Sequence, residues 1–313
     1  MVLNLKRLLL TIVASSCVLG VFAWKPIFIG HRGSFMGVMN TVEAYNNGVN
    51  HYGYQGLECD VRVTADGYYV ISHDETTNSV GGNLTVANAT LAELQAETYT
   101  QTRGGVTYTG HIYTVAEYLD ICVEKNVIPV VELKWTTGIN NNDMSKFPGL
   151  AALIEEKGLT DKAIILTTMR NSLEYVRTYF PILKCQYLCY SNWDTDFDWI
   201  VQWNLMPSIA VGHLDNHTVK RFHDKGIDVA VWSVNSLANY NLYGNMGVSM
   251  ITCDLLMASD MPELQDVDWD SIENINAAPS LDNNYYDLTG RKMKCSDLVP
   301  GIYINNSKKI IIQ

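Results

Sequence analysis

Ionisable side chains end several short apolar runs of this sequence, where a charge is costly unless a partner or an ion neutralises it. The residues are His31, Glu58, Asp60, His73 and Glu132. Strand side chains alternate between two faces, so Glu58 and Asp60 share one face, and so do Glu132 and Lys134. If these runs are neighbouring strands of one sheet, their side chains meet at a single site.

Three carboxylates at one site repel one another unless they are protonated or joined by a cation. Oxygen ligands alone suit a hard divalent ion, so Glu58, Asp60 and Glu132 predict one Ca2+ or Mg2+. Zn2+ fits less well, because the histidines would then have to be ligands and no cysteine is suitably spaced. With an ordinary pKa near ~6.5, His31 and His73 suit an acid and a base.

The elements that would position these residues alternate along the chain, as a (β/α)8 barrel requires. The candidate strands are 26–31, 55–61, 68–73, 128–134, 163–168, 184–190, 207–212, 228–234 and 250–254. Helical patterns between them include 41–52, 114–125, 150–157, 172–180 and 216–225. Barrel active sites assemble at the carboxyl ends of the strands, where the ionisable residues fall. We therefore predict an α/β protein with a TIM-barrel fold.

We expect the barrel to be irregular at its second and third strands. The candidate strands outnumber the eight places of a barrel, and the segment from Asp60 to His73 leaves no room for a helix. Its centre, Ala65-Asp66-Gly67, is typical of a tight turn, because Asp-Gly favours hairpin geometry.

Short motifs occur in order between about Trp24 and Pro262. They are Gly30-His31-Arg32-Gly33, Asn40-Thr41, Glu58-Cys59-Asp60-Val61, Thr64-Ala65-Asp66-Gly67, Ser72-His73-Asp74, Glu132-Leu133-Lys134 and Trp232-Ser233-Val234-Asn235. This set resembles the glycerophosphodiester phosphodiesterase family, which has a phospholipase-C-like phosphodiesterase barrel. One position departs from the pattern, since the family usually has Glu before the Asn-Thr pair and this chain has Met39.

The resemblance implies metal-dependent hydrolysis of glycerophosphodiesters to glycerol 3-phosphate and an alcohol. It implies His31 and His73 as the acid and base, without saying which is which, and the three carboxylates as metal ligands. It further implies that Arg32 and Lys134 bind the phosphate and that Trp232 contacts the glycerol. On a regular strand Arg32 would point away from His31, so it reaches inward only if the chain bends at Gly33. The nucleophile, water or the neighbouring glycerol hydroxyl, stays open.

Two other functions compete with this reading. A glycoside hydrolase also uses two acids, but it has no use for paired histidines and Lys134, and its carboxyls must flank the scissile bond. A non-catalytic barrel that binds glycerophosphoryl groups is the second alternative, and the presence of both histidines with all three acids argues against it.

The composition limits which classes of partner the protein can bind. A formal net charge of -11 disfavours a nucleic-acid or anionic-membrane surface, since phosphate polyanions would be repelled. A small-molecule glycerophosphodiester is the expected partner, and the sequence leaves the oligomeric state open. Of the seven cysteines, most are expected to be buried free thiols, because Cys185 and Cys189 lie too far apart along one predicted strand for a disulfide.

The two ends of the sequence differ from the barrel region 24–264. Lys6 and Arg7 precede an apolar run to Ala23, which predicts a cleaved signal peptide over 1–23 and no spanning segment in the mature protein. We expect export to the periplasm, the exterior or the cell surface of a bacterium, with a lipoprotein signal at Cys17 as the alternative.

The segment 265–313 predicts a β-rich appendage and resembles C-terminal tails of secreted Bacteroidetes-type proteins.

Overall fold

The computed structural model describes residues 23–269, 272, 285–286, 292–293, 301–305 and 308–312. The chain divides into one folded unit that ends at Val267 and a second that starts at Asp268. The predicted signal segment and Cys17 lie outside the described residues. Within the described part, no helix is both long and apolar enough to cross a membrane.

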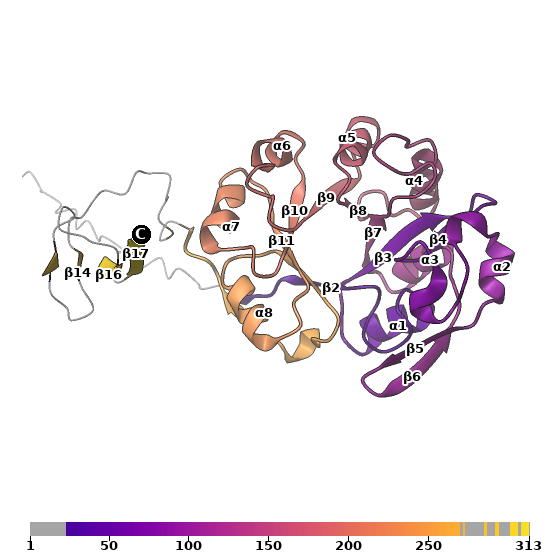
Figure 1. Ribbon diagram of the computed structural model, residues 1–313, viewed down its shortest axis with the longest axis horizontal. Coiled ribbons are helices and arrows are strands. Elements are labelled where there is room, and N and C mark those ends of the chain that lie inside the picture. The colour runs from indigo at the N-terminus through magenta and orange to yellow at the C-terminus, as the bar shows by residue number, and fades with distance from the viewer. Residues whose placement is uncertain are drawn as a thin grey trace, which may run out of the picture. The chain divides into compact units, whose positions relative to one another are not determined.

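Eight parallel strands form a closed barrel in the first unit (Figure 1). They are β2 (Ile27–Gly30), β3 (Gly56–Val63), β7 (Ile128–Leu133), β8 (Ile164–Thr167), β9 (Lys184–Cys189), β10 (Met206–Ala210), β11 (Ala230–Trp232) and β12 (Met250–Cys253). The barrel closes because β2 pairs with both β12 and β3. The predicted TIM-barrel fold is confirmed, and all eight strands fall on predicted ones.

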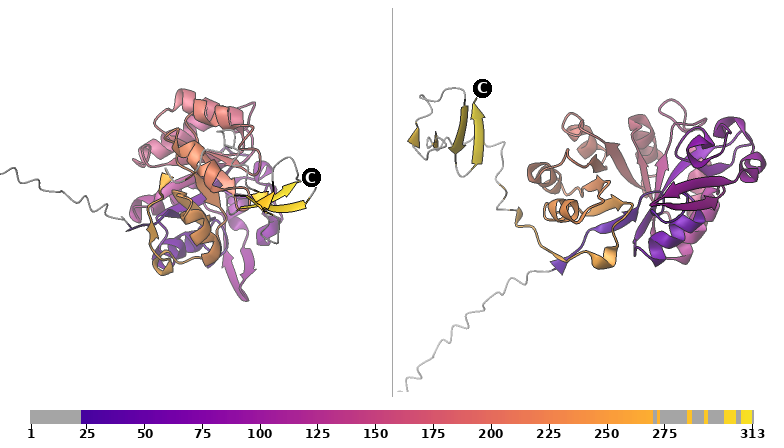
Figure 2. Two further views of the ribbon diagram at one scale, coloured as in Figure 1. Left: turned by 90° about the vertical axis from the view of Figure 1, so that its left-hand side faces the viewer. Right: turned by 60° about the horizontal axis from the view of Figure 1, so that its bottom comes forward.

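Helices surround this barrel (Figure 2). The predicted helices correspond to α1 (Val42–Asn50), α3 (Val115–Glu124), α4 (Phe147–Glu156), α5 (Arg170–Tyr179) and α7 (Asn216–His223). Three begin at a side-chain N-cap: the Thr41 hydroxyl accepts from the Ala44 amide, Thr114 forms a capping box with Glu117, and the Asp215 carboxylate accepts from the Thr218 amide.

Two further helices were not predicted, α6 (Phe197–Gln202) and α8 (Leu237–Gly244). The first is only six residues long. The second carries polar asparagines among its tyrosines, so neither shows a long apolar stripe.

The remaining predicted strand lies outside the barrel. This strand, β4 (Tyr69–Ile71), pairs antiparallel with the end of β3, with Val61 opposite Ile71. The turn between them needs Gly67, whose φ of +91° is the left-handed region that glycine favours. The predicted hairpin is thus confirmed, and it explains why no helix follows β3 directly.

A compact insertion follows the hairpin before the chain returns to α3. It contains the 3-10 helices η1 (Thr77–Val80) and η2 (Val86–Asn88), helix α2 (Leu91–Ala96) and the hairpin β5 (Tyr99–Arg103) with β6 (Val106–Gly110). The insertion has its own apolar core, in which Val86, Leu94 and Ile112 pack against Val38 and Val70. The β5–β6 hairpin projects from the barrel as an arm (Figures 1 and 2).

An apolar layer fills the barrel below the ionisable residues. It includes Ile29, Val130, Ile164, Leu166 and Met250, all nearly inaccessible to solvent. This layer excludes water from beneath the site, because branched side chains from alternate strands fill the interior of such barrels.

The described cysteines are buried free thiols, as predicted. They are Cys59, Cys122, Cys185, Cys189 and Cys253. The other two cysteines lie outside the described residues.

Short strands also mark both ends of the described chain. β1 (Ala23–Trp24) pairs antiparallel with β13 (Leu264–Gln265). The second unit holds a four-stranded antiparallel sheet of β14 (Tyr285–Tyr286), β15 (Lys292–Met293), β16 (Gly301–Asn305) and β17 (Lys308–Ile312), in the order β15-β14-β16-β17.

Candidate active site

The three predicted carboxylates lie together on two neighbouring strands. Asp60 of β3 stands opposite Glu132 of β7 in the strand register, and Glu58 lies one pair deeper on the same face. Ligand oxygens of the three side chains all lie within 4.8 Å of one another. Glu58 and Asp60 do not end their strand as expected, because pairing with β4 extends β3 to Val63. All three side chains are therefore deeply buried, at 2%, 1% and 9% exposure.

Two cations partly neutralise this cluster. The Lys134 Nζ lies 2.5 Å from Glu132 Oε1 and 3.0 Å from Asp60 Oδ1. The Arg32 Nε lies 3.4 Å from Asp60 Oδ2, and the Arg32 amide donates to Glu58 Oε2 at 2.8 Å. The predicted proximity of Lys134 and Arg32 to the carboxylates is thus present in the structure.

Burial and neighbouring charges shift the pKa values of the three carboxylates in different directions. Burial, then the charges of Asp60 and Glu132, raise the pKa of Glu58 well above its ordinary value. Burial also raises the pKa of Glu132. Burial opposes ionisation of Asp60 too, but Lys134 and Arg32 hold its pKa below the ordinary value. Glu58 and Glu132 therefore tend to be protonated unless a further cation stabilises their charges, because two side-chain cations do not fully offset three carboxylates.

The acidic cluster fits a divalent cation. The buried Glu58 Oε1 has no hydrogen-bond partner among the described residues, which is costly unless an ion or water occupies that side. Every donor atom is a carboxylate oxygen, the ligand type of hard ions such as Ca2+ and Mg2+. Glu58, Asp60 and Glu132 could thus hold a metal ion together.

A sharp bend after β2 turns Arg32 into the site. Arg32 has a φ of +50° and Gly33 a φ of +96°. A Cβ at Gly33 would lie 2.7 Å from the Ala44 backbone, so only glycine fits there. The chain bends as the inward placement of Arg32 requires, and the bend already begins at Arg32 itself.

Asn40 supports the same loop and was assigned no role from the sequence. It adopts a φ of +60°, which asparagine tolerates better than most residues. Its amide nitrogen donates to Asp60 Oδ2 at 2.8 Å, and its oxygen accepts from the Tyr45 hydroxyl at 3.0 Å. A buried tyrosine thus fixes the amide orientation, which in turn fixes one carboxylate of the cluster. The neighbouring Met39 places its sulfur 3.3 Å from an Arg32 nitrogen.

His31 is oriented by a carboxylate that sequence reasoning missed. Its Nδ1 lies 2.9 Å from Oδ1 of Asp254, the residue after β12. The other oxygen of Asp254 accepts from the Asn235 side-chain amide at 2.8 Å. Although burial opposes ionisation, the contact with His31 helps to hold the pKa of Asp254 below its ordinary value. An acid at the carboxyl end of the last strand was the signal that could have revealed this role.

His73 also contacts an aspartate, but this aspartate is its neighbour in the sequence. Its Nδ1 lies 2.7 Å from Oδ1 of the adjacent Asp74. Burial lowers the pKa of His73, although the charge of Asp60 opposes this shift, so the ring is mainly neutral at pH 7. A carboxylate on Nδ1 leaves Nε2 available for proton transfer in both histidines.

Trp232 ends β11 on the same face of the barrel. Its indole nitrogen donates to the Ser208 carbonyl at 3.0 Å, and its ring meets the Tyr190 ring edge-on at 5.0 Å. Because the N–H is already used, only the ring of Trp232 is available for contact with a ligand.

A cavity of about 230 Å³ opens beside His31. Asp254, Asn235, Arg103 and Phe35 help to line it. Arg103 comes from the β5–β6 arm, where it donates to the Ser34 carbonyl at 2.7 Å and lies over the Phe35 ring. The insertion therefore builds one wall of the site.

The fold and the site define a TIM-barrel protein with a buried acidic centre and two histidines, each held by an aspartate. Residues 31–256 match the Glycerophosphoryl diester phosphodiesterase family, and the chain belongs to that family. The resemblance found in the sequence motifs is confirmed.

Individual relatives agree with this assignment. A glycerophosphodiester phosphodiesterase of Caldanaerobacter subterraneus subsp. tengcongensis is 29% identical over 167 residues, which are 51% of this chain and 65% of the relative. The match thus spans slightly less than two thirds of that relative.

Solved structures share the fold. An Oleispira antarctica phosphodiesterase in complex with the product sn-glycerol-3-phosphate has a TM-score of 0.64 and 18% identity, over 74% of this chain and 93% of that one. A glycerophosphoryl diester phosphodiesterase from Parabacteroides distasonis has a TM-score of 0.60 and 18% identity, over 77% and 89%.

Proposed function

We propose that this protein hydrolyses glycerophosphodiesters to glycerol 3-phosphate and an alcohol. The observation that carries the proposal is the pair of aspartate-held histidines, His31 and His73, around a buried cluster of three carboxylates with Lys134 and Arg32. Membership of the family and the fold shared with a phosphodiesterase that binds sn-glycerol-3-phosphate support it.

The phosphate of the substrate binds between the cations of the site. Arg32 and Lys134 present guanidinium and ammonium groups beside the carboxylates, and both attract a diester anion. Glu58, Asp60 and Glu132 would hold one Ca2+ or Mg2+, which supplies positive charge at the phosphoryl oxygens when bound. The ring of Trp232 contacts the glycerol.

The two histidines move the protons. One accepts a proton at Nε2 from the attacking hydroxyl, either of water or of the glycerol, and the other donates a proton from Nε2 to the leaving oxygen. Asp254 and Asp74 fix the ring of each histidine and stabilise its protonated form. His73 stays mainly neutral at pH 7, because its pKa is lowered by burial.

A panel of glycerophosphodiesters, assayed with Ca2+, with Mg2+ and with chelator, tests this function. We expect release of glycerol 3-phosphate that depends on the added ion. His31→Ala and His73→Ala should each lower kcat by about 10²- to 10⁴-fold, the usual contribution of one general acid or base. His51→Ala, at an exposed helix end, is the matched control and should retain activity.

Two results would overturn the proposal. Undiminished turnover in chelator or in His31→Ala would exclude the mechanism. Tight binding of a diester without any turnover would instead indicate a binding protein.

We also propose export of the protein, on the basis of the signal pattern over 1–23. Mass spectrometry of the mature N-terminus tests this. A chain that starts at Trp24 supports cleavage by a secretory signal peptidase, and a diacylated Cys17 supports the lipoprotein alternative. Deletion of 265–313 would show whether the C-terminal segment acts in folding or in surface attachment.

A further inference from the structure

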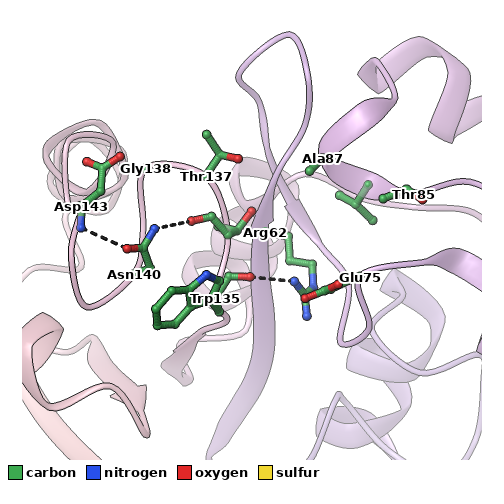
Figure 3. A pocket seen from close by; sticks show the side chains of 11 residues that line it. Arg62, Glu75, Thr85, Ala87, Trp135, Thr137, Gly138, Asn140 and Asp143 are labelled. Carbon is green, nitrogen blue, oxygen red and sulfur yellow. Dashed lines mark hydrogen bonds between the residues drawn. The ribbon is translucent and has the colours of Figure 1, made fainter.

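Arg62 connects the two loops that carry His73 and Lys134, although none of its hydrogen bonds goes to a side chain of the site. It lies two residues beyond Asp60 on the same face of β3 and is only 9% exposed. Its Nε and Nη2 donate to the His73 carbonyl at 3.2 and 2.9 Å, and its Nη1 donates to the Trp135 carbonyl at 2.9 Å. Figure 3 shows the guanidinium reaching the Trp135 carbonyl. One side chain thus ties the loop after β4 to the loop after β7.

This set of hydrogen bonds requires the shape of a guanidinium. Nε and Nη2 lie along one edge of the planar group and both meet one carbonyl oxygen, while Nη1 reaches a different carbonyl. Burial lowers the pKa of Arg62, and the charge of Glu75 opposes this shift most strongly, so the guanidinium stays protonated. Within the described part of the chain its hydrogen bonds go only to backbone carbonyls. The buried cation therefore holds the backbone in place.

The His73 loop depends on Arg62 more than the Lys134 loop does. Lys134 has other support, because its Nζ lies within ion-pair distance of two buried carboxylates. Among the described residues, the ring of His73 has one hydrogen-bond partner, Asp74, whose side chain is 43% exposed. The Trp135 carbonyl therefore serves as the anchor, and His73 is the residue that the two-pronged edge of Arg62 holds.

We propose that Arg62 is a positioning residue for His73 and holds it at the distance from the acidic cluster that proton transfer requires. This inference rests on the proposed diesterase function. Arg62 acts through the backbone of His73, so its loss leaves the imidazole present but misplaced. A misplacement of about 1 Å costs on the order of 10²-fold in rate, because the proton must pass between closely placed atoms.

Arg177 provides a matched control from outside the site. Its Nε donates to the Trp203 carbonyl at 3.1 Å, and its Nη1 donates to the Pro181 and Leu183 carbonyls at 2.9 and 3.2 Å. These carbonyls precede β9 and β10, at the amino ends of the barrel strands and thus opposite to the catalytic end. Arg177→Met therefore removes the same kind and number of hydrogen bonds as Arg62→Met without displacing a residue of the site.

Kinetics of the full chain on glycerophosphocholine, or on another diester that it hydrolyses, test the positioning role. Arg62→Met should lower kcat about 10²-fold and leave KM within about twofold, because His73 acts in the chemical step. Arg177→Met should lower the unfolding temperature by a similar amount but leave kcat within about twofold, since its carbonyl partners lie outside the site. In the His73→Ala background, Arg62→Met should change kcat less than about twofold, because the group that it positions is already gone.

The alternatives give different results. Equal falls in kcat for Arg62→Met and Arg177→Met would mean that the loss reflects stability alone, and would overturn the inference. A loss confined to KM, or a full further loss in the His73→Ala background, would also overturn it, because Arg62 would then act on another group. If Arg62→Met does not fold, Arg62→Lys keeps the charge without the two-pronged edge, and the same selective fall in kcat is expected of it.

NMR of the histidine rings separates this inference from the proposed function. If no diester releases glycerol 3-phosphate, the proposed function fails, but the place of His73 can still be measured. The ring signals of His73, identified by their absence in His73→Ala, should shift in Arg62→Met and stay unchanged in Arg177→Met. Unchanged His73 signals in Arg62→Met would overturn the positioning role.

Discussion

Both histidines of the site contact an aspartate through Nδ1, but one aspartate is distant along the chain and the other is the next residue. Asp254 lies 223 positions from His31 along the chain and reaches it from the neighbouring strand β12, and its second oxygen accepts from Asn235. Asp74 is the next residue after His73, and its other contact is the Ser79 hydroxyl. One pair depends on barrel closure, and the other needs only a local turn.

The two aspartates differ in the hydrogen bonds that their second partners, Asn235 and Ser79, can form. The side-chain amide nitrogen of Asn235 can only donate to Asp254, whereas a hydroxyl such as that of Ser79 can donate or accept. The side chain of Asp254 is also more enclosed, at 19% exposure against 43% for Asp74. The His31 pair is therefore rigidly specified, and the His73 pair can adapt.

The largest effect is expected from Asp254→Asn. The new amide must turn its oxygen to the Asn235 donor and its NH2 to His31, so His31 must carry its proton on Nε2 and cannot be protonated easily. We expect kcat to fall on the order of 10³-fold, comparable to other enzymes that lose the correct tautomer. Steady-state kinetics with a thermal unfolding scan would measure this. Asp196→Asn, which breaks the ion pair of the buried Asp196 with the exposed Arg170 instead, is the control. A loss below fivefold would show that Asp254 does not set the tautomer.

A compensating change should recover part of that loss. In the double variant Asn235→Asp with Asp254→Asn, the new carboxylate at 235 accepts from the amide NH2 at 254. The amide oxygen is then free to accept from His31, so the correct tautomer returns without the original charge. We expect activity at least about tenfold above that of Asp254→Asn alone, as coupling of residues in one network predicts. Additive losses in the double-mutant cycle would contradict the assigned hydrogen-bond directions.

The sequence could predict the barrel and the acidic cluster but not the support of His31. Strands such as 128–134 were recognisable because apolar runs end in charged residues. Asp254 also ended a predicted strand, yet nothing local connects it with a histidine at the other end of the chain. Only closure of the barrel by β12 and β2 makes them neighbours.

The insertion was missed for a different reason. Its core residues, such as Val86 and Leu94, are spaced among polar residues and face a core that the insertion itself completes. The β5–β6 arm did carry a signal, because Gly104-Gly105 between threonine-rich segments is typical of a hairpin. The bounds of α4 shifted because Pro148 fits the first turn of a helix, so the helix starts before the predicted residue.

Asp74→Asn should have a smaller effect than the same change at 254. When the amide oxygen at 74 faces His73, its NH2 faces Ser79, whose hydroxyl can accept that hydrogen bond, so the contact with His73 is kept. Water can also replace part of the contact at this exposure. We expect kcat to fall about tenfold or less. Asp224→Asn is a matched control, since Asp224 is 42% exposed and also holds a charged partner, Lys220. A fall as large as that of Asp254→Asn would erase the distinction between the two pairs.

The smallest expected difference is in acid stability. Folding lowers the pKa of Asp254 below its ordinary value of about 3.9, so its contacts with His31 and Asn235 contribute stability that is present above that pH and is lost as the pH falls through the folded pKa. The contribution is on the order of 1 kcal/mol. Urea unfolding between pH 7 and pH 3 should therefore show a steeper acid loss in the wild type than in Asp254→Asn. Folding also lowers the pKa of Asp74, but solvent screens that more exposed side chain, so Asp74→Asn should change the slope less. Equal slopes in the wild type and both variants would mean that neither pair stores stability, and that the barrel holds the two aspartates only for the chemistry of the histidines.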